Sequence, residues 1–322
     1  MQSWNCSMHP DDQLMQRTPL PYRAEFHPLG FAVQLSTNSP AVLRAAEASW
    51  GGWTRAFDHA PLEMRVLVHR DGSVPATEPV YRAQRHLFTI TADNANFGIC
   101  DLERGYCFSC VTPAVASDAY FRNHLLETMA YLTIDHLYIT ILHAGCVARN
   151  GHGVLLCGDP GAGKSCLAYA CMKRGWSMLS DDFSAIVRGR HDRMIIGKPE
   201  RIRFRPEALS LFPELAEAPY QVLQNGKRVF DFQTLTLPEA HVSRCCRADT
   251  ILFLDRCESG DAKLIPMDPQ EALARIEFDR PYWDTPIFEE HQENIKALLS
   301  SGVHYLRYSD FDGAIRILES LV

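Results

Sequence analysis

The sequence of 322 residues lacks any long uninterrupted run of apolar residues. Its longest apolar runs, such as Ile251 to Leu254, are far shorter than the ~18 residues that a membrane-spanning helix needs. The first residues, MQSWNCSMHPDDQ, also lack the basic start and the apolar stretch of a secretory signal peptide. We therefore expect a cytoplasmic location and no membrane partner.

An excess of positive charge is lacking as well. The chain has 32 basic and 39 acidic residues, for a net charge of −7, and neither residues 1–140 nor residues 141–322 are basic as a group. Because binding to nucleic acid needs a large positive surface, we expect no nucleic-acid partner. The stretch 188–205 is a local exception, with seven basic and two acidic residues. It is compatible with a solvated hairpin face or with a site for phosphate or an acidic substrate.

Metal-ligand patterns are sparse among the eleven cysteines. The one C-x-x-C pair is formed by Cys107 and Cys110, within the strand-like run GYCFSCV. Residues three apart in a strand point to opposite faces, so these thiols are poorly placed to share a zinc ion. An odd number of scattered cysteines in a cytoplasmic chain indicates reduced, mostly buried thiols.

The composition is that of a globular protein, with 46% hydrophobic and 22% charged residues, and the length suits two domains. Short alternating patterns predict a small α+β domain over residues 1–117, with a helix from Ala41 to Trp50 and a hairpin turn at Asp71-Gly72. An apolar face predicts a helix from Asp118 to His136, which opens an α/β domain over residues 118–322. Further elements are expected as strands at 30–35, 64–69, 86–92, 106–111 and 304–308, and as helices at 289–299 and 310–321.

The strongest motif is a glycine-rich sequence that follows an apolar strand. Residues 154–165 read Val-Leu-Leu-Cys-Gly-Asp-Pro-Gly-Ala-Gly-Lys-Ser, which matches G-x-x-x-x-G-K-S. The glycines let backbone N–H groups face a phosphate chain, Lys164 can reach its outer phosphates, and the Ser165 hydroxyl can ligate Mg²⁺. The predicted nucleotide-binding residues are Gly158, Asp159, Pro160, Gly161, Ala162, Gly163, Lys164, Ser165 and Cys166.

Two acidic positions compete for the role next to this loop. Asp181-Asp182 follows the strand that comes directly after the loop's helix, and a crossover would place it at the same sheet edge as the loop. One carboxylate there can hold Mg²⁺ and the other can accept the proton of an attacking hydroxyl. Asp255 also ends an apolar strand, and sequence geometry alone leaves the choice open. Upstream, the turn signal Asn150-Gly151 predicts a hairpin that places His143 on a strand beside the loop's strand.

In combination these residues resemble the C-terminal domain of HPr kinase/phosphorylase. The elements that carry the resemblance are His143-Ala-Gly, the GDPGAGKS loop, Lys173-Arg174-Gly175-Trp176 and Ser180-Asp181-Asp182, in this order. The resemblance implies a P-loop kinase fold, ATP and Mg²⁺ as cofactors, and a serine hydroxyl as the acceptor. It also implies catalytic roles for Asp182 as base, His143, Asp181 and Lys164, with Ser165 and Asp181 at the metal.

The resemblance is close only over residues 140–188. The family's E-V-R-G-x-G signature, which includes a second Mg²⁺ ligand, has no counterpart here, where the stretch reads Gly197-Lys-Pro-Glu-Arg-Ile-Arg-Phe-Arg205. Glu200 and Glu207 are the candidates for that ligand. This departure argues against phosphorolysis and against HPr itself as the substrate.

Three functions stay open on sequence grounds: a kinase for a protein or peptide hydroxyl, a kinase for a small-molecule alcohol, and a nucleotide-dependent switch or assembly ATPase. Asp182 and His143 favour a kinase, because a hydroxyl nucleophile benefits from a nearby base. The oligomeric state is open, a homo-oligomer included. Basic residues expected to contact the acceptor or the transferred phosphoryl group are Arg201, Arg203, Arg205, Lys227 and Arg228.

Overall fold

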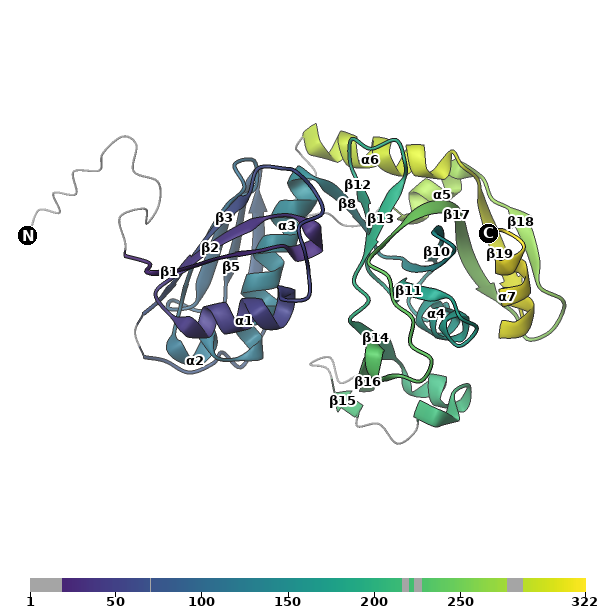
Figure 1. Cartoon of the computed structure of the whole chain (residues 1–322), viewed down its shortest axis with the longest axis horizontal. Coiled ribbons are helices and arrows are strands. Elements are labelled where there is room, and N and C mark those ends of the chain that lie inside the picture. Colours follow the sequence, from purple (N-terminus) through teal and green to yellow (C-terminus); the bar gives the residue numbers. More distant parts are fainter. Residues whose placement is uncertain (1–18, 70, 216–219, 223–227, 277–285) are drawn as a thin grey trace, which may run out of the picture. The chain divides into compact units, whose positions relative to one another are not determined.

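A computed structural model describes residues 19–69, 71–215, 220–222, 228–276 and 286–322. The chain is a mixed α/β protein of two compact units (Figure 1), which divide between Leu137 and Tyr138. The division expected from sequence lay after residue 117. The observed division lies later in the chain because the helical segment 121–137 packs on the first sheet, with Met129 and Ile134 fully buried. Within the described ranges, no helix has both the length and the apolar character needed to cross a membrane.

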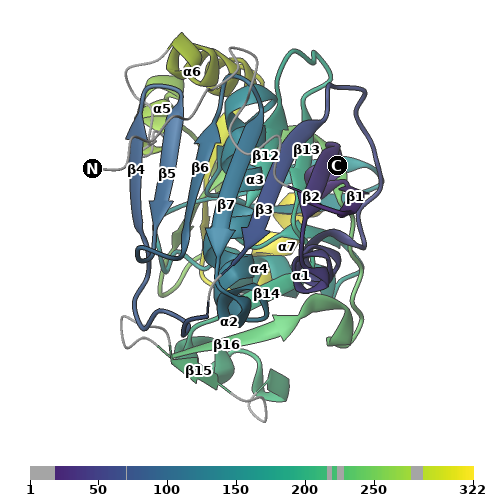
Figure 2. The ribbon, with the colours of Figure 1, turned by 90° about the vertical axis from the view of Figure 1, so that its left-hand side faces the viewer.

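The first unit is built on a seven-stranded mixed sheet with the order β1-β2-β3-β7-β6-β5-β4. Helix α1 (Pro40–Trp50) begins as predicted, because the Ser39 hydroxyl accepts a hydrogen bond from the Ala41 N–H and Pro40 occupies the first turn. The hairpin prediction at Asp71-Gly72 is wrong, since β3 pairs in parallel with both β2 and β7. The strands lie in front of α3 in Figure 2. Its remaining elements are β1 (Tyr22–Phe26), β2 (Val33–Thr37), β3 (Leu62–Val68), β4 (Val80–Gln84), β5 (Leu87–Thr91), β6 (Phe97–Asp101), β7 (Tyr106–Val111), α2 (Pro113–Ala116), a π-helical segment (Phe121–Leu126) and α3 (Glu127–Leu137).

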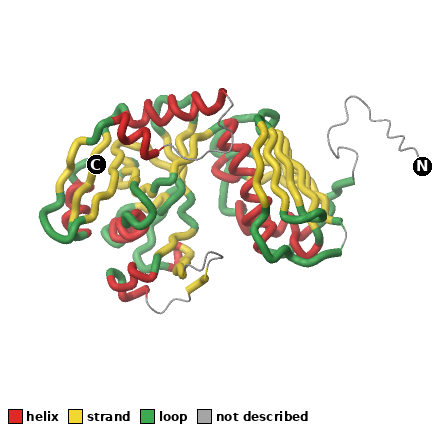
Figure 3. Tube along the Cα trace, turned by 180° about the vertical axis from the view of Figure 1, so that it is seen from behind, coloured by secondary structure: helices red, strands yellow, loops and turns green. Residues whose placement is uncertain are grey.

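The second unit contains a larger mixed sheet, whose strand order is β11-β9-β10-β17-β13-β12-β8, with β19 beside β17 and β18 beyond it. Alternate residues of its strands supply two separate cores. Leu156 and Leu252 pack with α4 and α7, whereas Leu155 and Ile251 pack with α5 and α6. Figure 3 shows these helices and strands by type. The elements are β8 (Ile139–Leu142), β9 (Gly145–Arg149), β10 (His152–Cys157), α4 (Lys164–Met172), β11 (Ser177–Ser180), β12 (Ser184–Val187), β13 (Met194–Gly197), β17 (Cys245–Arg256), β18 (Lys263–Pro266), α5 (Pro269–Ile276), α6 (Pro286–Leu299), β19 (Val303–Tyr308) and α7 (Phe311–Glu319).

The predicted hairpin before the glycine-rich loop is confirmed. Strands β9 and β10 pair antiparallel, and Asn150 and Gly151 between them have φ of 55° and 84°, as a two-residue turn of this kind requires. Strand β11 pairs antiparallel with β9, so β11 runs parallel to β10 with β9 between them. The carboxyl ends of β10 and β11 therefore meet at one edge of the sheet.

The sheet also curls back on itself. Strands β8 and β9 are far apart in the strand order, yet only His143 and Ala144 connect them. The Ser184 hydroxyl at the start of β12 donates to the Ala144 carbonyl at 2.9 Å, which holds the curled edge in place. The prediction that His143 lies on a strand beside β10 is wrong, because the chain leaves β8 at Leu142 and enters β9 at Gly145.

The basic stretch 188–205 is divided between two structures. Its first part is the exposed turn of the β12–β13 hairpin, where Arg190 pairs with Asp192. Its second part is β14 (Arg201–Phe204), in a small antiparallel sheet with the order β14-β16-β15. The hairpin-face interpretation therefore applies to the first part, whereas the second part belongs to a different sheet. The other strands of this sheet are β15 (Tyr220–Val222) and β16 (Arg228–Gln233).

Candidate functional site

The glycine-rich loop joins the end of β10 to the start of α4. Gly158, Gly161 and Gly163 have φ of 145°, 100° and 97°, a region that only glycine adopts without strain. A Cβ atom on Gly161 would lie 3.1 Å from a guanidinium nitrogen of Arg205, and one on Gly163 would lie 3.1 Å from the Tyr308 hydroxyl. The loop is therefore shaped by its glycines, and two side chains from other elements approach it closely, although Asp159, Pro160 and Gly161 remain exposed.

Lys164, the first residue of α4, folds back over this loop. Its side chain is nearly buried, and Nζ donates to the Gly158 carbonyl at 2.6 Å and to the Asp159 carbonyl at 3.5 Å. Burial lowers the pKa of Lys164, while nearby acidic groups oppose that change. The ammonium group thus lies at the amino end of the loop, next to Gly158.

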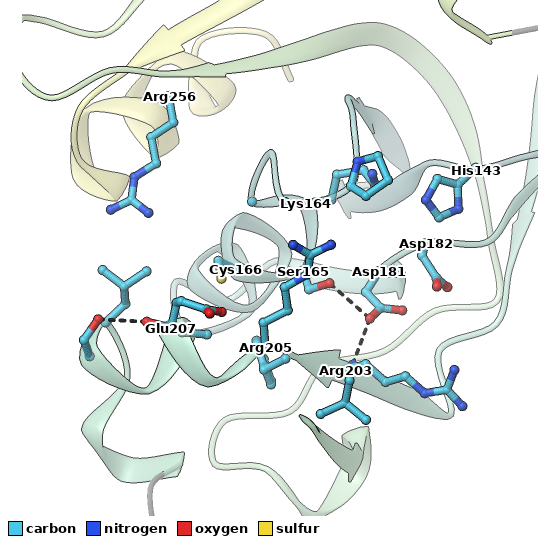
Figure 4. Close-up of a pocket in the computed structure, with 18 residues that line it drawn as sticks. His143, Lys164, Ser165, Cys166, Asp181, Asp182, Arg203, Arg205, Glu207 and Arg256 are labelled. Carbon is cyan, nitrogen blue, oxygen red and sulfur yellow. Dashed lines mark hydrogen bonds between the residues drawn. The ribbon is translucent and has the colours of Figure 1, made fainter. Parts of the chain in front are cut away.

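Asp181 connects β11 to the loop's helix. Its Oδ2 atom accepts a hydrogen bond from the Ser165 hydroxyl at 3.2 Å and another from the Arg203 backbone N–H at 2.9 Å (Figure 4). The residue is only 6% exposed. Burial, followed by repulsion from Asp182, raises the pKa of Asp181 to about 7. Sequence reasoning placed this aspartate beside the loop, and the structure does bring them together.

Asp182 and His143 lie at the same end of the site (Figure 4), and both are exposed to solvent. Partial desolvation and the positive charge of Lys164 lower the pKa of His143, although Asp182 raises it. The imidazole is therefore mostly neutral at pH 7. A neutral imidazole and an exposed carboxylate are both groups that can accept a proton.

These residues line one cavity of about 670 Å³, a volume within the range of ligand-binding cavities. Its floor is formed by the loop and the start of α4, and Asp181, Asp182 and His143 lie at one end. Cys166 and Arg256 extend the lining away from that end (Figure 4). The lining also includes Arg203, Phe204, Arg205, Glu207, Ala208, Leu211 and Val229.

Asp255, the competing carboxylate, is engaged elsewhere. Its Oδ2 atom accepts a hydrogen bond from Nε of Arg307 on β19 at 2.7 Å, and it is absent from the described lining of the cavity. The neighbouring Phe253 packs with α5 and α6, and Asp255 shares that face of β17 because residues two apart do. Of the two acidic positions, the structure thus places Asp181 and Asp182 in the cavity lining and Asp255 against Arg307.

Two of the basic candidates, Arg201 and Arg228, are absent from the described lining of the cavity. Arg201 pairs with Asp231 at 2.8 Å, and the Arg228 guanidinium lies 4.9 Å from the centre of the Tyr220 ring. Arg203 also pairs with Asp231, at 3.2 Å, but it does line the cavity. Lys227 lies outside the described residues. Of the two candidate second metal ligands, Glu207 lines the cavity, whereas Glu200 pairs with Arg244.

Sequence reasoning missed Arg256 and Tyr308. Arg256 directly follows Asp255 at the end of β17, so its side chain points to the opposite face, toward the cavity. Tyr308 ends β19, and its buried hydroxyl has no hydrogen-bond partner among the described residues. Arg256 ends β17, which is parallel to β10, and Tyr308 ends β19, which is parallel to β17. Ligand sites form at the carboxyl ends of parallel strands, and this rule could have identified both residues.

The donor set suits a magnesium ion that is shared with a bound phosphate. Within the described ranges, no group of three or more His, Cys, Asp or Glu side chains is arranged to hold a metal. The Ser165 hydroxyl and Asp181 carboxylate provide two adjacent oxygen atoms. Mg²⁺ typically takes one or two protein oxygens and completes its shell with phosphate and water, so these two residues fit it.

Comparisons with known proteins give distant likenesses among solved structures. No family model matches the sequence, and no curated protein matches it. Among solved structures, the HPr(Ser) kinase/phosphatase from Coxiella burnetii is similar with a TM-score of 0.29 and 12% sequence identity. The similarity covers 56% of this chain and 92% of that chain. A likeness at this level establishes no activity for this chain.

Proposed function

We propose that this protein is a phosphotransferase that moves the γ-phosphoryl group of ATP to a hydroxyl group. The observation that carries the proposal is the hydrogen bond between Ser165 and Asp181, which joins the glycine-rich loop to an acidic pair at one end of a nucleotide-sized cavity. The sequence resemblance of the same residues to HPr kinase/phosphorylase supports it independently.

In this proposal the loop binds the phosphate chain. Backbone N–H groups of residues 158–163 and the amino end of α4 attract the anion, and Lys164 provides a compact positive charge. Ser165 and Asp181 would hold Mg²⁺, which neutralises charge on the phosphate oxygens. Ionisation of Asp181, whose pKa is raised to about 7, is favoured by any cation bound to it.

The proton of the acceptor is assigned to Asp182. The acceptor oxygen forms a bond to the γ-phosphorus while the bond from that phosphorus to the bridging oxygen of ADP breaks, and its electron pair stays on ADP. The Asp182 carboxylate accepts the hydroxyl proton, and the neutral imidazole of His143 at the same end of the cavity is a second group that can accept it. The Arg205 guanidinium near Gly161 can stabilise charge on the transferred group.

The acceptor expected from the sequence is a serine side chain of a protein or peptide, with a small-molecule alcohol as the alternative. A switch or assembly ATPase is a weaker candidate on structural grounds. Such proteins commonly hold Mg²⁺ with an aspartate at the end of a neighbouring parallel strand, and here Asp255 in that position is absent from the described lining of the cavity.

The test is a pair of matched substitutions, Asp182→Asn and Asp255→Asn. Asp182→Asn keeps the shape but removes the proton-accepting charge, so phosphoryl transfer should fall by ~10²–10⁴-fold with little change in ATP affinity. Asp255→Asn should behave like the unaltered protein. Transfer of radiolabelled γ-phosphate and the binding of a fluorescent ATP analogue measure the two quantities. Loss of Mg²⁺-dependent binding in Asp255→Asn, with Asp182→Asn active, would favour the switch ATPase.

A further inference from the structure

A second cavity, of about 290 Å³, adjoins the amino end of the glycine-rich loop. Gly158 and Asp159 line it, and His143 and Pro160 line both this cavity and the larger one. Its other walls are mostly apolar, from Leu142 and Phe253 among others. The two cavities therefore share a boundary at His143 and the loop.

A nucleotide bound to the loop would be oriented with its γ-phosphate toward this boundary. Lys164, which reaches the outer phosphates in a loop of this type, has its Nζ atom against the Gly158 carbonyl at 2.6 Å. The larger cavity continues in the opposite direction, along Cys166 toward Arg256. The γ-phosphoryl group would thus face the second cavity, on the condition that the proposed function is correct.

Arg275 of α5 provides the positive charge of this second cavity. Its guanidinium lies 5.0 Å from the centre of the Phe253 ring and donates to the Tyr305 hydroxyl at 3.3 Å, so the group is held in place. Its partner Asp159 is 3.4 Å away, with a side chain 85% exposed. Such an exposed ion pair contributes little, and an anionic ligand can replace Asp159 there.

We propose that the second cavity is the acceptor site and that it binds a small hydroxy acid. The carboxylate of the ligand would pair with the Arg275 guanidinium, which matches carboxylate geometry, while its hydroxyl would face His143 and the γ-phosphoryl group. The volume is near the lower limit for ligand cavities, which favours a compound of few atoms over a peptide segment. The products would be ADP and the phosphorylated hydroxy acid, and the hydroxyl proton would pass to Asp182, which lines the larger cavity at the end shared with His143.

The experiment offers radiolabelled ATP and Mg²⁺ with glycolate, lactate, glycerate or serine, with the neutral alcohols ethylene glycol and glycerol, and with a serine-containing peptide. We expect label transfer to at least one acid, about tenfold or more faster than to a neutral alcohol of similar size. Arg275→Gln should reduce that transfer by about tenfold or more through a higher KM for the acid. Arg275→Lys keeps the charge and should retain part of the rate.

Arg307→Gln is the matched control, because Arg307 also pairs with an aspartate, Asp255, but lines neither cavity in its described part. It should transfer label like the unaltered protein. The acceptor proposal would be overturned by transfer to the peptide alone, by equal transfer to acids and neutral alcohols, or by no transfer to any acid. An unchanged rate in a folded Arg275→Gln protein would also overturn it. A separate measurement of Mg·ATP binding tests the phosphotransferase site itself. If the acceptor proposal fails but Lys164→Ala abolishes Mg·ATP binding, the proposed phosphotransferase site is still supported. If Lys164→Ala still binds Mg·ATP, that site is overturned.

Discussion

Asp181 is a carboxylate in an unfavourable place for a charge. It is almost fully buried, beside a second carboxylate, and its two hydrogen bonds from Ser165 and the Arg203 backbone offset only part of that cost. The folded protein binds a proton here more tightly than the unfolded chain does. Stability from this residue is therefore fully present below about pH 4, near the unfolded pKa, and is lost as the pH rises to about 7.

We predict that Asp181→Asn stabilises the ligand-free protein more at pH 8 than at pH 5. The asparagine oxygen can still accept both hydrogen bonds, but no charge has to be buried at high pH. Thermal unfolding in a chelator, without nucleotide, measures the two differences. A shift in Tm that is the same at both pH values would show that burial of charge is not what limits Asp181. Under the proposed function, the same substitution should weaken Mg²⁺-dependent ATP binding.

Single residues also show what the sequence could not reveal. The position of Lys164 followed from the glycine-rich motif, and that of Asp181 from the rule that parallel strands end at a common edge. Arg275 and Tyr308 are distant from the motif in sequence, and their places beside the loop depend on how β17, β19 and α5 pack. Such tertiary contacts have no local pattern, so the second cavity could not be predicted.

At the scale of elements, the connection from β10 to α4 depends most on backbone conformation. We predict that Gly163→Ala lowers ATP affinity by about tenfold or more, because the residue has a φ of 97° and its Cβ would lie 3.1 Å from the Tyr308 hydroxyl. Gly189→Ala is the matched control, since Gly189 also has positive φ, of 70°, but has open space around it. Isothermal titration with Mg·ATP compares the two. Equal losses of affinity would contradict a specific role for the loop's shape.

Elements with a clear local pattern were predicted closely. Helix α1 and the Asn150-Gly151 hairpin formed as expected, because helix-start and turn residues act within a few positions. The hairpin at Asp71-Gly72 did not form, although its residues suit a turn equally well. There, β3 is covered on both edges by parallel partners that come from elsewhere in the chain. Long-range pairing therefore overrode the local turn signal.

At the scale of the whole molecule, the two units have separate sheets and separate buried cores, so we expect two unfolding transitions. Mg·ATP at about 100 times its Kd should stabilise only the second unit, by ~2.7 kcal/mol, which raises its Tm by roughly 5–10 °C. Differential scanning calorimetry with and without nucleotide makes the measurement. A single transition that shifts as a whole would show that the units unfold together.

The curled sheet of the second unit restricts how the chain can change in length. One residue inserted between Leu142 and Gly145 would either displace His143 or reverse the faces of β9, exchanging Val147 with Cys146 and Ala148 between the two cores. The exposed turn at 189–192, by contrast, contributes no side chain to either cavity among the described lining residues. Insertions should therefore be tolerated in that turn, and a tag or reporter domain placed there should leave the sheet intact.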